Sequence, residues 1–184
     1  MIRAKAENAL IALGSDLGDR SRHLRFAVER IASLPRTRLV RGSSFYKNPP
    51  VGVPASGAGR GRRGAGLFLN AVVEVRTGLS PEGLLVELKR LEALRGRRPA
   101  PRWSPRPLDC DLLFHGRRRI RTRLLRVPHP LALRRAFVLV PLAEILPMWS
   151  PPVTPRRTVR CWMRRSKLDL ENVKWAEDPP KVRP

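Results

Sequence analysis

The chain has 184 residues, 42% of them hydrophobic, which suits a single domain with one core. Its formal net charge of +23 predicts an anionic partner, such as a nucleotide or a phosphate-rich ligand. No stretch reaches the roughly 20 apolar residues that a membrane helix needs, and two cysteines are too few for a disulfide framework. No secretory signal pattern is recognised at the N-terminus. We therefore expect one cytoplasmic domain over residues 1–184 with no membrane partner.

The positive charge comes mainly from arginine, and the arginines are scattered along the whole chain. A scattered charge is equally compatible with a solvated surface that has no dedicated partner, because net charge bears on solubility and association rather than on a site. The charge alone therefore does not choose between a nucleotide, a nucleic acid and no partner.

The N-terminal part predicts a strand, a helix and an extended segment. Ala9–Leu13 is a short apolar run closed by Gly14 and indicates a buried strand. Apolar side chains at helical spacing predict a helix over Ser21–Leu34, which Pro35 ends. The following residues, Thr37–Tyr46, have an extended pattern.

The middle of the chain again predicts a strand, a helix and a strand, which follow a segment of biased composition. Residues 53–66 consist largely of Gly, Ala and Arg, have almost nothing to bury, and predict a mobile loop. Leu67–Val75 predicts a strand, and a helix follows from Pro81 to about Arg95. Leu108–Phe114 predicts the next strand.

The C-terminal part predicts smaller additions. Arg117–Arg126 is compatible with a hairpin, Leu133–Leu146 with a helix kinked or broken at Pro141, and Val159–Asp169 with a last helix. The tail from residue 176 is expected to be disordered.

The element order predicts the fold class. Strand, helix, strand, strand, helix, strand is the order of the split βαβ, ferredoxin-like arrangement. We therefore expect an α+β fold with a mostly antiparallel sheet, helices on one face, and C-terminal helical additions.

Two aspartates in an apolar strand form the sharpest chemical feature. Side chains alternate along a strand, so Asp109 and Asp111 share one face while Cys110 points to the core. The carbons that carry the carboxylates then lie about 6.6 Å apart, from the rise per residue. Magnesium prefers one or two carboxylates plus substrate phosphates, so the pair predicts a magnesium site. Two solvated aspartates at a strand end are the alternative.

Cations precede the aspartates. Arg102, Trp103 and Arg106 lie just upstream, and arginines beside metal-binding carboxylates supply the charge that phosphoryl transfer needs. The alternative is a basic surface loop with a packed tryptophan.

Other residues suit a flat heterocycle. The bend that ends Ser43–Gly52 contains two prolines, and Phe68 and Asn70 share one face of the next predicted strand. Phe137 is a second candidate for stacking. His129 lies between two prolines, so a ligand contact and a structural role are equally compatible with it. Each of these residues also fits an ordinary core or turn.

Together, these stretches resemble the 6-hydroxymethyl-7,8-dihydropterin pyrophosphokinase family. The pattern RWSPRPLDCDLLFHG is specific to that family, and the other matching stretches occur in the family's order. The matching segments are Ile11–Arg20, Ser43–Gly52, Phe68–Val75, Leu91–Arg97, Arg102–Gly116 and Val127–Ile145. One departure is Asp16, where the family often has asparagine.

The resemblance implies transfer of the terminal diphosphate of ATP to the pterin hydroxymethyl group, with release of AMP, by a monomer that uses two magnesium ions. It implies a metal site at Asp109 and Asp111 and catalytic roles for Arg97, Arg106, Asp109 and Asp111. It implies a pterin pocket of Asn48, Pro50, Val51, Phe68, Asn70 and Phe137. It implies an ATP side of Glu92, Arg97, Arg102, Trp103, Arg106, His129 and Arg135. The sequence does not identify the base that takes the hydroxyl proton.

A basic ferredoxin-like RNA-binding module without catalysis is the alternative function. Such a domain carries aromatic residues on its exposed strands, whereas this chain has only 5% aromatic residues and lacks that pattern. Paired aspartates also repel a nucleic-acid backbone unless a metal neutralises them. We therefore expect no specific nucleic-acid partner.

Overall fold

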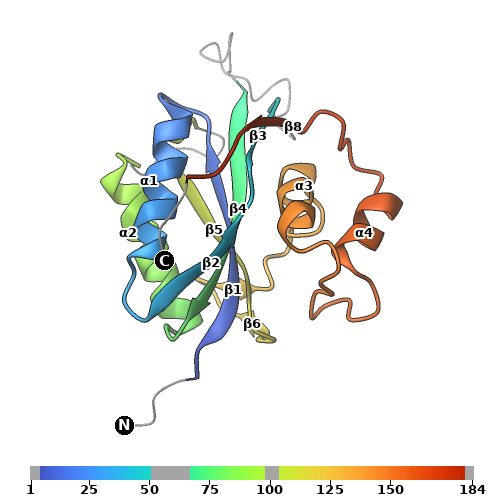
Figure 1. The fold of residues 1–184 in the computed structure, drawn as a ribbon. Coiled ribbons are helices and arrows are strands. Elements are labelled where there is room, and N and C mark those ends of the chain that lie inside the picture. Colours follow the sequence, from blue (N-terminus) through green and yellow to red (C-terminus); the bar gives the residue numbers. More distant parts are fainter. Residues whose placement is uncertain (1–4, 51–66, 98–103, 181–184) are drawn as a thin grey trace.

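Strand β1 (Glu7–Ser15) lies inside an antiparallel sheet of the computed structural model, which describes residues 5–50, 67–97 and 104–180 (Figure 1). The path of strands is β5-β1-β4-β3-β8, and β2 also pairs with β4. Each neighbouring pair in this sheet is antiparallel. The other strands are β2 (Thr37–Gly42), β3 (Phe45–Asn48), β4 (Phe68–Thr77), β5 (Asp109–His115) and β8 (Lys174–Glu177).

Two helices connect these strands as the ferredoxin-like order requires. Helix α1 (Arg20–Ala32) begins at Asp19, whose side chain accepts a hydrogen bond from the N–H of Arg22. Helix α2 (Pro81–Leu94) begins at Ser80, whose hydroxyl accepts from Gly83 N–H. The predicted ferredoxin-like α+β fold is confirmed.

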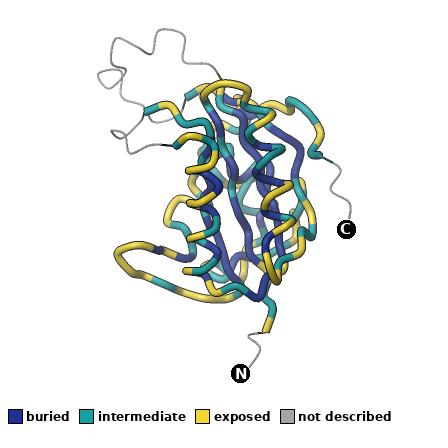
Figure 2. Tube along the Cα trace, turned by 90° about the vertical axis from the view of Figure 1, so that its left-hand side faces the viewer, coloured by how far each residue is buried: buried dark blue, intermediate teal, exposed yellow. Residues whose placement is uncertain are grey.

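Helices cover both faces of the sheet, because the C-terminal helical additions lie on the face opposite the two helices of the ferredoxin-like order (Figure 1). The helices α1 and α2 pack on one face, and α3 (Ala136–Ile145) and α4 (Val159–Arg165) lie on the other. Each face has its own core cluster, with Ile11, Leu24 and Leu88 in the first and Leu10, Val72 and Leu139 in the second. Figure 2 shows the buried strands between these outer layers. Alternate residues of β1 and β4 point to opposite faces, and apolar residues occur in both sets. Both faces of the sheet therefore need a cover.

The segment Thr37–Tyr46, expected to be extended, is divided between β2 and β3 by a break at Ser43 and Ser44. Ser43 N–H still donates to the carbonyl of Val72 (2.9 Å), but the return bond runs from Val72 N–H to the Ser43 hydroxyl (3.0 Å). The hydroxyl thus replaces a backbone carbonyl at the break, which leaves both strands paired with β4.

The tail was expected to be disordered from residue 176, and this is wrong for Ala176 and Glu177. Both belong to β8, which pairs with the outer edge of β3. Glu177 also forms an ion pair with Arg25 of α1, 2.7 Å between Nη2 and Oε2. An exposed strand edge offers unpaired backbone groups, which explains why a polar, charged segment orders there.

Smaller differences concern element ends. The predicted hairpin is confirmed as β6 (Ile120–Arg121) paired with β7 (Arg126–Val127). Helix α3 begins later than predicted and runs through Pro141, and α4 ends at Arg165. The Gly/Arg-rich segment 53–66 lies outside the described residues. Among the described residues, no helix is long and apolar enough to cross a membrane.

Replacing Leu88 with alanine tests the packing of α2 on the sheet. Leu88 is fully buried, so Leu88→Ala is expected to lower the free energy of unfolding by about 2–5 kcal/mol. Val86 lies on the same helix and is 64% exposed, so Val86→Ala is expected to change it by less than about 0.5 kcal/mol. Urea denaturation measures both, and equal losses would contradict the packing described.

Candidate active site

Strand β5 presents the two aspartates on the face opposite the first core cluster. Cys110, between them, is fully buried in that cluster, while Asp109 and Asp111 are partly exposed. Burial raises the pKa of the Cys110 thiol well above its ordinary value, so the sulfur stays protonated and serves as core. The predicted alternation of these side chains is confirmed.

Three arginines surround the two carboxylates. Arg97 Nη1 lies 2.6 Å from Asp109 Oδ1, and Arg106 Nη1 lies 3.3 Å from the same oxygen. Arg135 Nη1 lies 3.7 Å from Asp111 Oδ2. The structure thus brings together five residues from three separate stretches of sequence, with an excess of positive charge. Such a cluster can hold an anion and a divalent cation side by side.

The end of helix α2 directs Arg97 back toward β5. Gly96 adopts a positive φ of 85°, which allows the N–H of Arg97 to bond the carbonyl of Glu92 (3.1 Å). The turn brings the Arg97 guanidinium against both Glu92 Oε2 and Asp109. A side chain at position 96 would strain this conformation.

Glu92 lies behind β5 rather than on the open side of the site. Its side chain is 2% exposed and accepts from Cys110 N–H (2.8 Å), from Lys89 Nζ (2.7 Å) and from Arg97. Burial raises the pKa of the Glu92 carboxyl, and Lys89, the Cys110 N–H and Arg97 only partly reverse this. Burial lowers the pKa of Arg97, but Asp109 and Glu92 outweigh it and raise the pKa above its ordinary value.

Arg106 is held by Asp16, a residue to which the sequence analysis assigned no role in the site. Asp16 Oδ1 accepts from Arg106 N–H (2.5 Å), and Asp16 N–H donates to the Arg106 carbonyl (3.2 Å). This two-bond link fixes the segment before β5 to the loop after β1. No pattern in the sequence pairs two positions so far apart, although Asp16 was noted as a departure from the resembling family.

Two buried asparagines stand side by side at the ends of β3 and β4. Asn70 Nδ2 donates to Asn48 Oδ1 (2.6 Å), and Asn48 Nδ2 donates to the carbonyl of Pro49 (2.7 Å). Gly14 of β1 lies opposite Asn70, and a Cβ there would come within 3.2 Å of the Asn70 Oδ1. Gly14 therefore leaves the space that this amide occupies. Buried amides fixed in this way suit recognition of a heterocycle with donors and acceptors on one edge.

Helix α3 and the segment before it supply the remaining residues of this face. Arg135 precedes α3, and its guanidinium carbon lies 5.5 Å from the centre of the partly buried Phe137 ring. His129 is anchored through its N–H to the carbonyl of Leu113 (2.8 Å). Burial lowers the pKa of His129, so its imidazole is neutral at pH 7. The neutral Nδ1 accepts a hydrogen bond from Leu131 N–H (3.2 Å).

Glu144 of α3 fixes the break between β2 and β3, which the sequence analysis missed. Its carboxylate accepts from Ser44 N–H (2.9 Å) and from the Ser44 hydroxyl (2.8 Å). Burial first, and then the Glu144 carboxylate, raise the pKa of Tyr46 to about 12. Tyr46 lies directly across from Asn70 in the sheet. Glu144 thereby ties α3 to the strand that carries Asn48.

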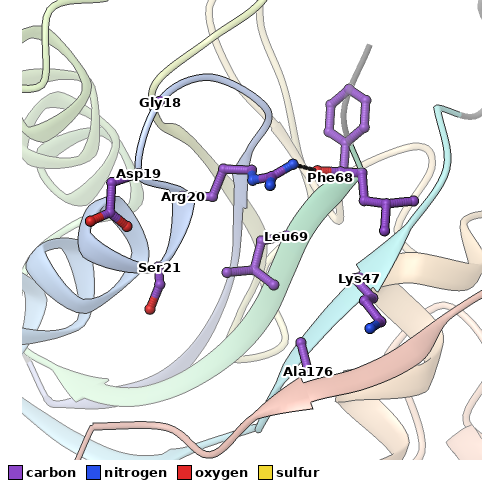
Figure 3. Close-up of a pocket in the computed structure, with 9 residues that line it drawn as sticks. Gly18, Asp19, Arg20, Ser21, Lys47, Phe68, Leu69 and Ala176 are labelled. Atoms are coloured by element: carbon purple, nitrogen blue, oxygen red, sulfur yellow. Dashed lines mark hydrogen bonds between the residues drawn. The ribbon is translucent and has the colours of Figure 1, made fainter. Parts of the chain in front are cut away.

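A cavity of about 330 Å³ lies on the face of β4 that carries Leu69, opposite the face that carries Asn70 (Figure 3). Figure 3 shows Leu69 between Ser21 of α1 and Lys47 of β3, with Ala176 of β8 nearby. The Phe68 ring points away from Ser21 and Leu69, although Phe68 also lines the cavity. Asp109 and Asp111 do not line it, so this cavity is separate from the aspartate cluster.

Three predicted site residues, Val51, Arg102 and Trp103, lie outside the described residues. Pro50 is described and partly buried. Among the described residues, no group of three or more His, Cys, Asp or Glu side chains gathers as a metal cage. Asp109 and Asp111 alone therefore fit magnesium only when phosphate or water oxygens complete its coordination.

A family model described as 7,8-dihydro-6-hydroxymethylpterin-pyrophosphokinase matches residues 10–147. The 2-amino-4-hydroxy-6-hydroxymethyldihydropteridine pyrophosphokinase of Bacillus subtilis is 38% identical over 165 residues, covering 88% of this chain and 93% of that protein. This chain belongs to the pterin pyrophosphokinase family. The Haemophilus influenzae pyrophosphokinase of the same name is 42% identical over 137 residues, covering 74% of this chain and 80% of that protein.

Solved structures share the fold of this pyrophosphokinase family member. A triple-mutant HPPK-DHPS from Plasmodium falciparum superimposes with a TM-score of 0.72 at 15% identity, covering 95% of this chain and 47% of that chain. The wild-type protein with pteroate gives a TM-score of 0.68 at 15% identity, covering 93% of this chain and 46% of that chain. The chain thus spans about half the length of those solved chains.

Titration of Tyr46 tests the contact between α3 and β3. Tyr46 is the only tyrosine, so ultraviolet absorbance of the phenolate reports on it alone. The midpoint is expected at about 12, and Glu144→Gln is expected to lower it toward the ordinary value of 10.0 because a negative neighbour is removed while burial remains.

Glu171 is exposed and serves as the matched control, so Glu171→Gln is expected to leave the Tyr46 midpoint unchanged. Circular dichroism at each pH establishes that the protein is still folded. An unchanged midpoint in Glu144→Gln would contradict the contact.

Proposed function

We propose that this chain transfers the terminal diphosphate of ATP to the hydroxymethyl group of 6-hydroxymethyl-7,8-dihydropterin, a step of folate synthesis, and releases AMP. Family membership and the relatives' names support this activity, and neither supports an RNA-binding module. The observation that carries the proposal is the pair Asp109 and Asp111 on one strand face with three arginines around it. Paired carboxylates with adjacent arginines match the needs of phosphoryl transfer.

Asp109 and Asp111 would hold magnesium, and we propose two ions there. Bound magnesium neutralises phosphate charge and orients the phosphate oxygens for in-line attack. Strand alternation keeps both carboxylates on one face, while the arginines that contact them fix their direction. The protein supplies position and charge rather than a covalent intermediate.

The three arginines match the charge of the transferring group. In the transfer, the pterin hydroxyl oxygen forms a bond to the β-phosphorus as the bond from that phosphorus to the bridging oxygen of AMP breaks. Arg97, Arg106 and Arg135 contact the two aspartates, and in this proposal they stabilise the negative charge that spreads over the phosphate oxygens. His129, Arg102 and Trp103 complete the proposed ATP side. Glu92 was expected there too, but its carboxylate is buried and already bonded behind β5.

The asparagine pair and two aromatic rings form the proposed pterin pocket. Asn48 and Asn70 fix each other's amides, so each presents a defined edge to the ring. Phe68 and Phe137 come from β4 and α3 and supply stacking surface. The prolines after β3, together with Val51, complete the pocket in this proposal.

We also propose that the enzyme acts as a one-domain monomer in the cytoplasm. Both cysteines are free thiols, which fits a reducing compartment.

The first test measures AMP release from ATP with and without the pterin, in magnesium and in excess EDTA. Release that needs both the pterin and magnesium is expected. Asp109→Asn or Asp111→Asn is expected to lower the rate by about 10²–10³-fold or more, the size typical for loss of one charge-stabilising group. Asp169 is exposed and distant in sequence, so Asp169→Asn is the control and should retain the rate.

Two results would overturn parts of the proposal. Full activity in both aspartate variants would remove the metal assignment. No AMP under any condition, together with tight salt-sensitive RNA binding by the same preparation, would favour the nucleic-acid module.

A further inference from the structure

The residue between the two aspartates is held through its backbone by helix α2. Cys110 N–H donates to Glu92 Oε1 (2.8 Å), and Lys89 Nζ donates to the Cys110 carbonyl (3.2 Å). Lys89 Nζ also donates to Glu92 Oε1 (2.7 Å). One ion pair on α2 therefore binds both backbone polar groups of Cys110.

The position of β5 explains why such a contact is needed. Strand β5 is an edge of the sheet, with β1 as its strand neighbour in the described part of the chain. The outward backbone groups of an edge strand lack a ladder partner, and an edge held on one side only can shift or twist. Lys89 and Glu92 supply a donor and an acceptor where a further strand would otherwise stand.

Glu92 reaches Asp109 by a second route as well. Its Oε2 contacts Arg97, and Arg97 Nη1 lies 2.6 Å from Asp109 Oδ1. The same carboxylate thus orients the backbone beside Asp109 and the guanidinium that touches the Asp109 side chain. Charges alternate in sign along Lys89, Glu92, Arg97 and Asp109, so each is stabilised by its neighbours.

We propose that Lys89 and Glu92 are positioning residues that set the placement of the Asp109 and Asp111 carboxylates for metal and nucleotide. This inference rests on the proposed function, in which those carboxylates hold magnesium. Neither residue touches the reacting atoms. Groups that orient metal ligands from behind commonly change metal affinity about 10–100-fold when removed.

Packing of α2 does not require this ion pair. Leu84 and Leu88 are fully buried and Leu91 is 4% exposed, and these side chains already fix the helix against the sheet. The Glu92 carboxylate is 2% exposed and costly to desolvate, while Lys89 is 44% exposed, so their ion pair is weak support for stability by itself. The contacts with Cys110 give the pair a geometric role that apolar packing does not supply.

The decisive comparison is Lys89→Met against Arg90→Met. Arg90 is the next residue on α2, and its side chain is 72% exposed with one weak contact, 3.9 Å to Glu87. Mn²⁺ binding is measured by electron paramagnetic resonance with a non-hydrolysable ATP analogue present. Lys89→Met is expected to weaken Mn²⁺ binding by about ten-fold, and Arg90→Met to leave it unchanged.

Steady-state kinetics separate positioning from general destabilisation. In Lys89→Met the magnesium concentration for half-maximal rate is expected to rise and kcat to fall, while KM for the pterin stays constant. Glu92→Gln is expected to act likewise, with Glu87→Gln as its matched control. Lys89→Arg keeps a donor and a charge and is expected to restore most of the metal affinity. The double variant that combines Lys89→Met with Glu92→Gln should lose less free energy of Mn²⁺ binding than the sum of the two single variants.

The outcomes distinguish this inference from the function on which it rests. If Asp109→Asn leaves Mn²⁺ binding unchanged, the metal assignment itself is wrong. If Asp109→Asn weakens binding but Lys89→Met behaves like Arg90→Met, only the positioning role is wrong. A lower melting temperature in Lys89→Met without any change in Mn²⁺ affinity or kcat would also overturn it.

Discussion

Burial of Cys110 in an edge strand is the constraint on which the site depends. Because its side chain is fully enclosed beneath α1 and α2, the residues on either side must project to the opposite face. That face is the one covered by α3, and Arg135, just before α3, lies near Asp111. The alternation that builds the core therefore also positions the two carboxylates, and a shift of β5 by one residue would turn both of them inward.

The second requirement is a balance of charge around those carboxylates. Three arginines beside two aspartates leave a net positive surface, which attracts a nucleotide while keeping a place for a divalent cation. Each arginine comes from a different connection between elements: the end of α2, the segment before β5 and the start of α3. The cluster of arginines and aspartates therefore forms only when all three connections are folded against the sheet.

Local patterns predicted much of this arrangement from the sequence. Element order predicted the ferredoxin-like topology, and alternation predicted the shared face of Asp109 and Asp111. Long-range polar pairs could not be predicted, because such pairs leave no periodic pattern in the sequence. Asp16 with Arg106 and Ser44 with Glu144 are two examples. The tail was misjudged for the same reason: β8 is polar and charged, and only the open edge of β3 makes it a strand.

That last strand also bears on where the folding unit ends. The family match stops at residue 147, yet β8 begins at Lys174 and closes the edge of β3, the strand that carries Asn48. A fragment cut at the family boundary would expose that edge and leave Arg25 without Glu177. The folded unit of this chain therefore extends past the family match to β8, some thirty residues further along, and the similarity to the Bacillus subtilis relative, over 88% of this chain, also runs past residue 147.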